Sequence, residues 1–231
     1  MRSGPVIYRS GPEVDPGEAS MQFRLFWEGQ LRPANMDPRG TQLDRLADHK
    51  HTIRRAFHRQ LKHFWQIHPF LRDAHTWGEV FGRRITRTPS DRRPLVEVTA
   101  EVHPTLNGFR FVPLVCEEYQ LLCRVDLLLL RRDRPGSVLQ SSDLDNRLKV
   151  VFDALKMPTK PGELGDNTPQ EDEDPLFVLV QEDSLISHVS VETDELLDPP
   201  PESGKDDYYV RLLVKVTLTP YYLTNFNQSF G

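Results

Sequence analysis

The stretch from Tyr119 to Leu155, YQLLCRVDLLLLRRDRPGSVLQSSDLDNRLKVVFDAL, changes its hydrophobic period halfway along. Its first part is a nearly continuous apolar run interrupted by Arg124 and Asp126, which is typical of a central strand covered on both faces. A loop follows, and beyond Asp145 the apolar residues recur every three or four positions, as they do on one face of a helix. The stretch therefore predicts a strand, a loop and an amphipathic helix over Asn146–Leu155.

The same period rules place the remaining elements. Thr41 and Asp44 resemble a capping box, and they begin a helical pattern that runs to Ile67. Alternating or continuous apolar runs predict strands at 21–28, 94–102, 176–180, 185–193 and 208–219. These elements predict an α+β fold, a mixed sheet flanked by two helices.

Composition sets the domain organisation. A chain of 231 residues predicts one domain, over 21–231, behind a loose Gly- and Pro-rich arm at 1–20. Residues 157–175 are Pro, Gly and acid without periodicity, and we expect them to be a mobile acidic insertion that contributes little to the core. Cys116 and Cys123 match no common metal or redox spacing and are expected to be reduced packing residues. No membrane span and no signal peptide are evident, so a cytoplasmic protein is expected.

The charge is unevenly distributed along the chain. Residues 1–150 carry a balance of +6 and residues 151–231 a balance of −11, within a net charge of −5. This asymmetry suits a protein that binds a polyanion with one face and metal ions with another, although two solvated faces of opposite sign would look the same.

The predicted Asn146–Leu155 helix collects negative charge at its start. On a helical wheel Asp145, Lys149 and Asp153 share the polar face, and Asp143, if extended, points to the side of Asp145. Carboxylates this close repel unless a cation or proton is shared, and Mg²⁺ takes oxygen ligands of this kind. The alternative is that Asp145 caps the helix and forms an ordinary i,i+4 pair with Lys149.

The long helix has a basic face. A phosphate-contacting role is one interpretation and a solvated outer face is the other. The predicted DNA-contacting residues, with one from the shorter helix, are Lys50, Arg54, Arg55, Arg59, Lys62 and Arg147. The histidines of this helix show no His-Glu-x-x-His pattern, so a metal site among them is a weaker prediction.

A second acidic pair, Glu182 and Asp183, sits in the turn between two predicted strands. Together with Asp-Leu-Asp-Asn, a lysine four residues after the second aspartate, and Asp-Ala-Leu four residues later, the order of elements resembles the RusA-type Holliday-junction resolvases. The resemblance covers about 121–219. Its matching positions are Asp143, Asp145, Asn146, Lys149, Asp153, Ala154, Leu155, Glu182 and Asp183.

The resemblance implies a homodimeric, Mg²⁺-dependent endonuclease that cleaves branched DNA, of a kind common in phages and used in recombination and repair. Asp143, Asp145 and Asp183 would then hold the metal with support from Glu182, and Mn²⁺ would be expected to substitute. Lys149 would be the catalytic cation, stabilising charge at the phosphate or positioning the attacking water.

Three departures separate this chain from the family pattern. The acidic insertion replaces a short loop, Glu182 stands where an aspartate is usual, and the net charge is negative. These departures leave two alternatives: a noncatalytic DNA- or protein-binding member of the same fold, its site masked by the insertion, and a nuclease for forks or flaps.

Overall fold

The computed structural model of the chain describes residues 21–34, 42–73, 93–132, 143–200, 208–223 and 227–230. The predicted arm at 1–20 lies outside these residues. Among the helices of the described part, none is long and apolar enough to span a membrane.

Four strands form the main sheet, in the order β1-β6-β3-β5. Their bounds are β1 Gln22–Gln30, β3 Leu121–Arg131, β5 Ile186–Glu195 and β6 Tyr209–Pro220. β6 pairs antiparallel with both β1 and β3, whereas β5 pairs parallel with β3 at the edge. The predicted mixed sheet flanked by helices is confirmed, and β3 holds the predicted interior position.

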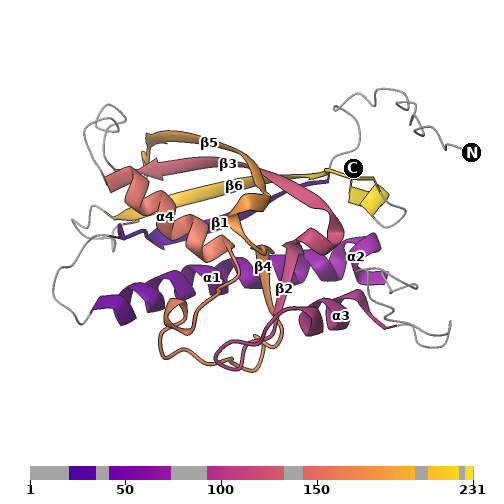
Figure 1. Cartoon of the computed structure of the whole chain (residues 1–231). Helices are drawn as coiled ribbons and strands as arrows, with labels where there is room; N and C mark the ends of the chain where they lie inside the picture. The colour runs from indigo at the N-terminus through magenta and orange to yellow at the C-terminus, as the bar shows by residue number, and fades with distance from the viewer. Residues whose placement is uncertain are drawn as a thin grey trace, which may run out of the picture.

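The sheet turns one face to the core. Alternate residues of β3 and β6 are buried and pair across the strands, as Val125 does with Val216 and Leu127 with Val214. α1 (Gln42–Ile67) and α4 (Asp143–Leu155) lie together on this side of the sheet (Figure 1). The other face of β3 is only partly buried, so the expected burial on both faces is found on one.

A second, two-stranded parallel sheet was not predicted. It pairs β2 (Phe111–Val115) with β4 (Leu176–Val180), and every residue of both strands is buried. Pro113 interrupts the apolar run of β2 and obscures its strand signal, because proline cannot donate to a strand ladder. β4 itself matches its prediction.

The predicted strand at 94–102 is wrong, because this segment forms the helix α3 (Leu95–Val102). A short run with β-branched residues fits the two-residue period of a strand as well as the 3.6-residue period of a helix. Here the helix forms and buries Leu95, Val98 and Thr99 on one side. Arg93 pairs with Glu97 and Glu101, a four-residue charge spacing that signals a helix. The shorter elements are α2 Pro69–Asp73, η2 Glu117–Tyr119, η4 Pro161–Glu163, η5 Asp183–Leu185 and η7 Asn227–Phe230.

Candidate functional site

α4 carries the acidic motif and is anchored by its apolar face. Val150, Val151, Ala154 and Leu155 are fully buried, whereas Asp145 and Lys149 are exposed. The helix begins at Asp143 rather than at Asn146, so Asp143 has helical rather than extended backbone. Residues two apart on a helix lie about 200° apart around its axis, so the backbone does not favour the expected convergence of Asp143 and Asp145.

The ordinary structural roles proposed for Asp145 are not observed. Asp145 is the third residue of α4, not its cap. Within the described part of the chain, Asp145 and Lys149 form no ion pair with each other, although Arg93 and Glu97 do so at the same spacing. Both side chains are therefore left open to solvent at the start of the helix.

The far end of α4 is an ion-pair network. Asp153 Oδ2 lies 2.6 Å from Lys50 Nζ of α1, and Asp153 Oδ1 lies 3.8 Å from Lys156 Nζ. Lys156 Nζ also donates to Asp183 Oδ2 at 3.0 Å. Burial lowers the pKa of Lys156, but the hydrogen bond and charge of Asp183, with nearby acids, outweigh it and raise the pKa above its ordinary value. Asp153 thus joins α4 to α1.

Asp145 and Asp183 consequently lie near opposite ends of α4. Asp183 contacts Lys156, which directly follows α4 and lies eleven positions after Asp145, a rise of about 16 Å along the helix. Near the helix start, Asn146 O accepts from Ala34 N, and Arg147 lies 5.2 Å from the ring centre of Tyr208, just before β6. The predicted joining of these acids around one cation within one chain is not found in this conformation. Glu182 is exposed beside Asp183 and accepts from Ser184 Oγ at 2.7 Å.

Much of the basic face of α1 is occupied by contacts within the chain. Arg54 is buried and donates to Asp153 O at 2.7 Å, and burial lowers its pKa to about 10. Arg55 Nε lies 2.5 Å from Glu173 Oε1, and Lys62 donates to Asp172 O at 2.7 Å.

Six residues were predicted to contact DNA, and the structure commits five of them to other interactions or to the interior. Arg147 is also buried and lies over Tyr208, and Lys50 pairs with Asp153. In this conformation Arg54 and Arg147 are not accessible to a polyanion, and of the six only Arg59 is well exposed to solvent.

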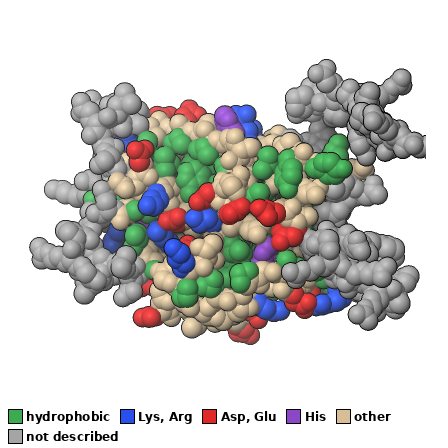
Figure 2. Space-filling view, in the orientation of Figure 1, with side chains coloured by type: hydrophobic (Ala, Val, Ile, Leu, Met, Phe, Trp, Pro, Cys, Tyr) green, Lys and Arg blue, Asp and Glu red, His purple; other side chains and the backbone are tan. Residues whose placement is uncertain are grey.

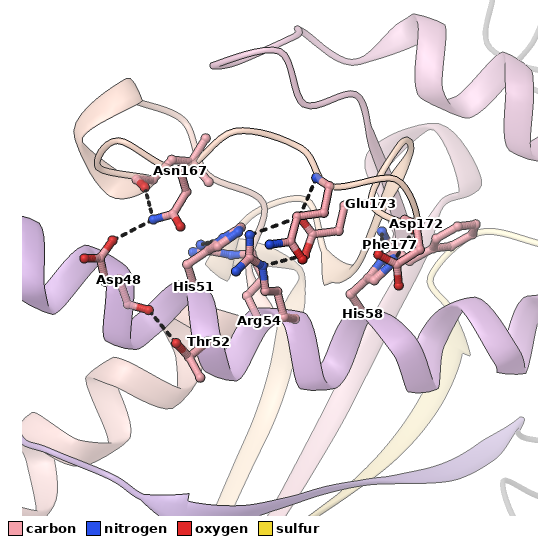
Figure 3. A network of polar contacts seen from close by, with 12 residues as sticks. Asp48, His51, Thr52, Arg54, His58, Asn167, Asp172, Glu173 and Phe177 are labelled. Atoms are coloured by element: carbon pink, nitrogen blue, oxygen red, sulfur yellow. Dashed lines mark hydrogen bonds and ion pairs between the residues drawn. The ribbon is translucent and has the colours of Figure 1, made fainter.

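The acidic segment 158–175 forms the cover of this basic face, as the close view of α1 shows (Figure 3). Glu173 is buried against Arg55, and Asn167 donates to Asp48 Oδ1 of α1 at 2.7 Å. Leu164 is fully buried in a cluster with Phe109 and neighbouring apolar residues. The expectation that this segment contributes little to the core is therefore wrong.

Two histidines of α1 are held neutral beneath the same cover. His58 Nδ1 accepts from Phe177 N at 2.9 Å, which leaves Nε2 to donate to Asp172 O at 3.0 Å. Burial lowers the pKa of His58, and burial with the charges of Arg54 and Arg55 lowers the pKa of His51 to about 3. His58 thus connects the helix to the cover, whereas His51 packs on the ring of Phe109, and neither belongs to a group of potential metal ligands in the described part of the chain.

One potential metal-binding group of three was not predicted. Both cysteines are unpaired and buried, as expected. Cys116, however, lies with His103 and Glu118 so that one ligand atom of each falls within 4.8 Å of the others. The spacing 103–116–118 follows no common motif, so no sequence signal pointed to it.

Comparison of the chain with protein-family models, curated proteins and solved structures finds no match. The resemblance to the RusA-type resolvases therefore rests on the motif residues and the order of elements alone.

Proposed function

We propose that the chain is the subunit of a homodimeric, Mg²⁺-dependent endonuclease that cleaves branched DNA. The observation that carries the proposal is the exposure of Asp145 and Lys149 in the first half of α4, where no described residue caps the helix through Asp145 or forms an ion pair with either side chain. A carboxylate and a lysine one helical turn apart match the needs of phosphodiester hydrolysis, which requires a metal ligand and a cation near the phosphate.

The acidic segment does not argue for a masked site. Its described contacts are with α1 and with the chain around β2, through Arg55, Lys62 and Arg110. Asp145, Lys149, Glu182 and Asp183 all remain exposed. The negative charge of the segment thus faces partly exposed basic side chains of the same chain.

A second subunit offers a way to join the two groups of acids. β5 is the edge strand of the sheet, and its outer edge has no partner among the described strands. Val189 and Val191 of β5 stand in register with Val125 and Leu127 of the core face, yet they are 45% and 37% exposed. Figure 2 shows hydrophobic side chains gathered on the surface in the region of β5. An open apolar edge strand is suited to pairing with another chain.

Twofold symmetry would bring opposite ends of α4 together. In a C2 dimer the same patch meets itself, so β5 would pair antiparallel with the partner's β5. Asp183 lies just before the start of β5. The first turns of α4 lie at the other end of the sheet, because Arg147 contacts Tyr208 at the start of β6. The start of β6 pairs with the end of β3, as Val210 does with Arg131. Asp183 of one subunit would then approach Asp145 of the other, once at each end of the interface.

The carboxylates fit Mg²⁺ as donors, because this ion takes oxygen ligands and is commonly held by one or two carboxylates. When bound, Mg²⁺ polarises a phosphate oxygen and lowers the pKa of a coordinated water. Asp145 would be the ligand on α4, with Asp143 as a further candidate and with Asp183 and Glu182 supplied by the partner. Lys149 would stabilise negative charge that develops on the phosphate.

The test is cleavage of labelled four-way junction, fork and linear duplex with Mg²⁺, with Mn²⁺ and with neither metal. We expect junction cleavage that needs the metal, and we expect Asp145→Asn to bind the junction without cutting it, because the ligand charge is lost at nearly constant volume. Asp166→Asn, an exposed acid of the segment, is the matched control and should keep full activity. Equal cleavage by Asp145→Asn and Asp166→Asn would refute the site.

A second candidate is a noncatalytic DNA- or protein-binding member of the same fold. The separation of Asp145 from Asp183 within one chain is the observation that favours it. Junction binding without metal-dependent cleavage by the unmodified chain would select this candidate, and cleavage of forks alone would redirect the substrate of the first.

A further inference from the structure

A compact group of potential metal ligands lies outside α4. His103 follows α3, Cys116 follows β2, and Glu118 belongs to η2. One ligand atom from each residue lies within 4.8 Å of the other two, so small side-chain movements would bring all three to a single ion. Within the described ranges this is the one group of three or more His, Cys, Asp or Glu residues with that geometry.

The surroundings of the group favour a cation over simple packing. His103 is 6% exposed and Cys116 is fully buried. Oε2 of Glu118 is also buried and accepts no well-formed hydrogen bond from the described residues, although the Cys116 thiol lies close enough to interact with this carboxylate. A buried carboxylate oxygen without a donor costs free energy, and a coordinated cation would satisfy it.

We propose that His103, Cys116 and Glu118 form a zinc-binding site. Thiolate and imidazole ligands select borderline or soft cations such as Zn²⁺ and disfavour Mg²⁺ and Ca²⁺. One thiolate and one carboxylate together neutralise the dication, so the loaded site would carry no net charge into the interior. Three protein ligands leave a tetrahedral position for water or another small ligand.

The protonation states of the free ligands define the binding reaction. An ordinary imidazole is mostly neutral at pH 7 and above, so His103 can offer a lone pair to a metal ion. An ordinary cysteine thiol is mostly protonated at this pH, so the Cys116 sulfur begins as a thiol. Binding therefore breaks one S–H bond, forms one S–Zn bond and releases one proton to the buffer.

The site would join the end of α3 to the end of β2. α3 packs on β2, and a buried hydrogen bond between Thr99 Oγ1 and the Tyr119 hydroxyl already links α3 to η2. The backbone N of Glu117 donates to Gln181 Oε1 at 3.0 Å, so a zinc ion bound next to Glu117 would also stabilise the turn that carries Glu182 and Asp183. This inference does not depend on the proposed nuclease activity.

The test is metal binding by the full chain after chelator treatment, with Zn²⁺ followed by calorimetry and Co²⁺ by absorption. We expect about one equivalent of metal, about one proton released, and a thiolate-to-cobalt charge-transfer band. Cys116→Ser should weaken Zn²⁺ binding at least about 100-fold and remove the band, while Cys123→Ser should retain both. Asp145→Asn should also retain both, which separates this site from the one on α4.

A second pair of variants keeps the proposal testable if Cys116→Ser does not fold. Glu118→Gln should weaken Zn²⁺ binding, whereas Glu117→Gln, an exposed neighbour, should not. If the folded, unmodified chain bound no Zn²⁺, the assignment would be overturned. Equal Zn²⁺ affinity in Glu118→Gln and Glu117→Gln would overturn it as well.

Discussion

Replacing Glu173 by glutamine should destabilise the chain strongly for a change at a loop position. The Glu173 side chain is 3% exposed, with Oε1 2.5 Å from Arg55 Nε and Oε2 3.3 Å from Arg55 Nη2. Oε2 also accepts from Gln170 N at 3.1 Å. Glu173→Gln keeps the volume but leaves the guanidinium facing an amide group without a negative charge.

The expected cost follows from the burial of the two partners. Removing one partner of a fully buried ion pair costs about 3–5 kcal/mol because the other charge is left uncompensated. The Arg55 side chain is 27% exposed, and water can solvate part of it, so we expect about 2 kcal/mol. In a chain of this length that corresponds to a fall in Tm of roughly 4–8 °C.

The assay is denaturant unfolding followed by circular dichroism, supported by thermal melts. Glu171→Gln is the matched control, because Glu171 is an exposed acid of the same segment, and it should change stability by less than about 0.5 kcal/mol. Equal stability of the two variants would refute the conclusion that the acidic segment is part of the folded core.

Two further predictions test the same cover. Leu164→Ala should cost about 2–4 kcal/mol in unfolding free energy, because Leu164 is fully buried with Phe109 and Met157; a loss below about 1 kcal/mol would contradict that packing. The stability of the chain should fall as the pH drops below about 6.5, because the unfolded state protonates histidines that the fold holds neutral. The pKa of His51 in the fold is lowered to about 3, so between pH 6.5 and pH 3 this residue reduces the free energy of unfolding by about 1.4 kcal/mol per pH unit. The stability of His51→Leu should therefore decline less steeply from pH 6.5 to 5 than that of the unmodified chain. An unchanged slope would contradict a neutral His51. Val189→Lys with Val191→Lys should reduce self-association measured by light scattering, whereas Leu223→Lys, exposed beyond β6, should not; a monomeric unmodified chain would contradict the β5 interface.

Periodicity was sufficient for most of the elements. The apolar spacing of β1, β6, α1 and α4 predicted these elements, whereas β3 was predicted from a nearly continuous apolar run although it buries only one face. α3 failed because Val96, Val98 and Ala100 fit a strand as well as a helix over so short a span. The salt-bridge spacing from Arg93 to Glu101 was the better signal there.

Long-range partners could not be predicted from local sequence. Nothing in the sequence of α1 shows whether its basic side chains bind phosphates or pair with acids of the same chain. The acids lie more than 100 positions away, as Glu173 does from its partner Arg55. The separation of Asp145 from Asp183, by contrast, could have been predicted from the order of the elements. A helix that connects two parallel strands starts beyond the end of the first and finishes near the start of the second, so β3, α4 and β5 place these acids at opposite ends.

The most direct test of the proposed catalytic centre uses two inactive variants together. Asp145→Asn and Asp183→Asn chains, carrying different tags and co-expressed, are purified as a heterodimer and assayed on the four-way junction with Mg²⁺. If the acids meet across the dimer, one of the two centres is intact, and the heterodimer should nick the junction at about half the strand-cleavage rate of the unmodified dimer while both variant homodimers stay inactive. A heterodimer as inactive as the homodimers, beside an active unmodified dimer, would contradict a centre built from two subunits.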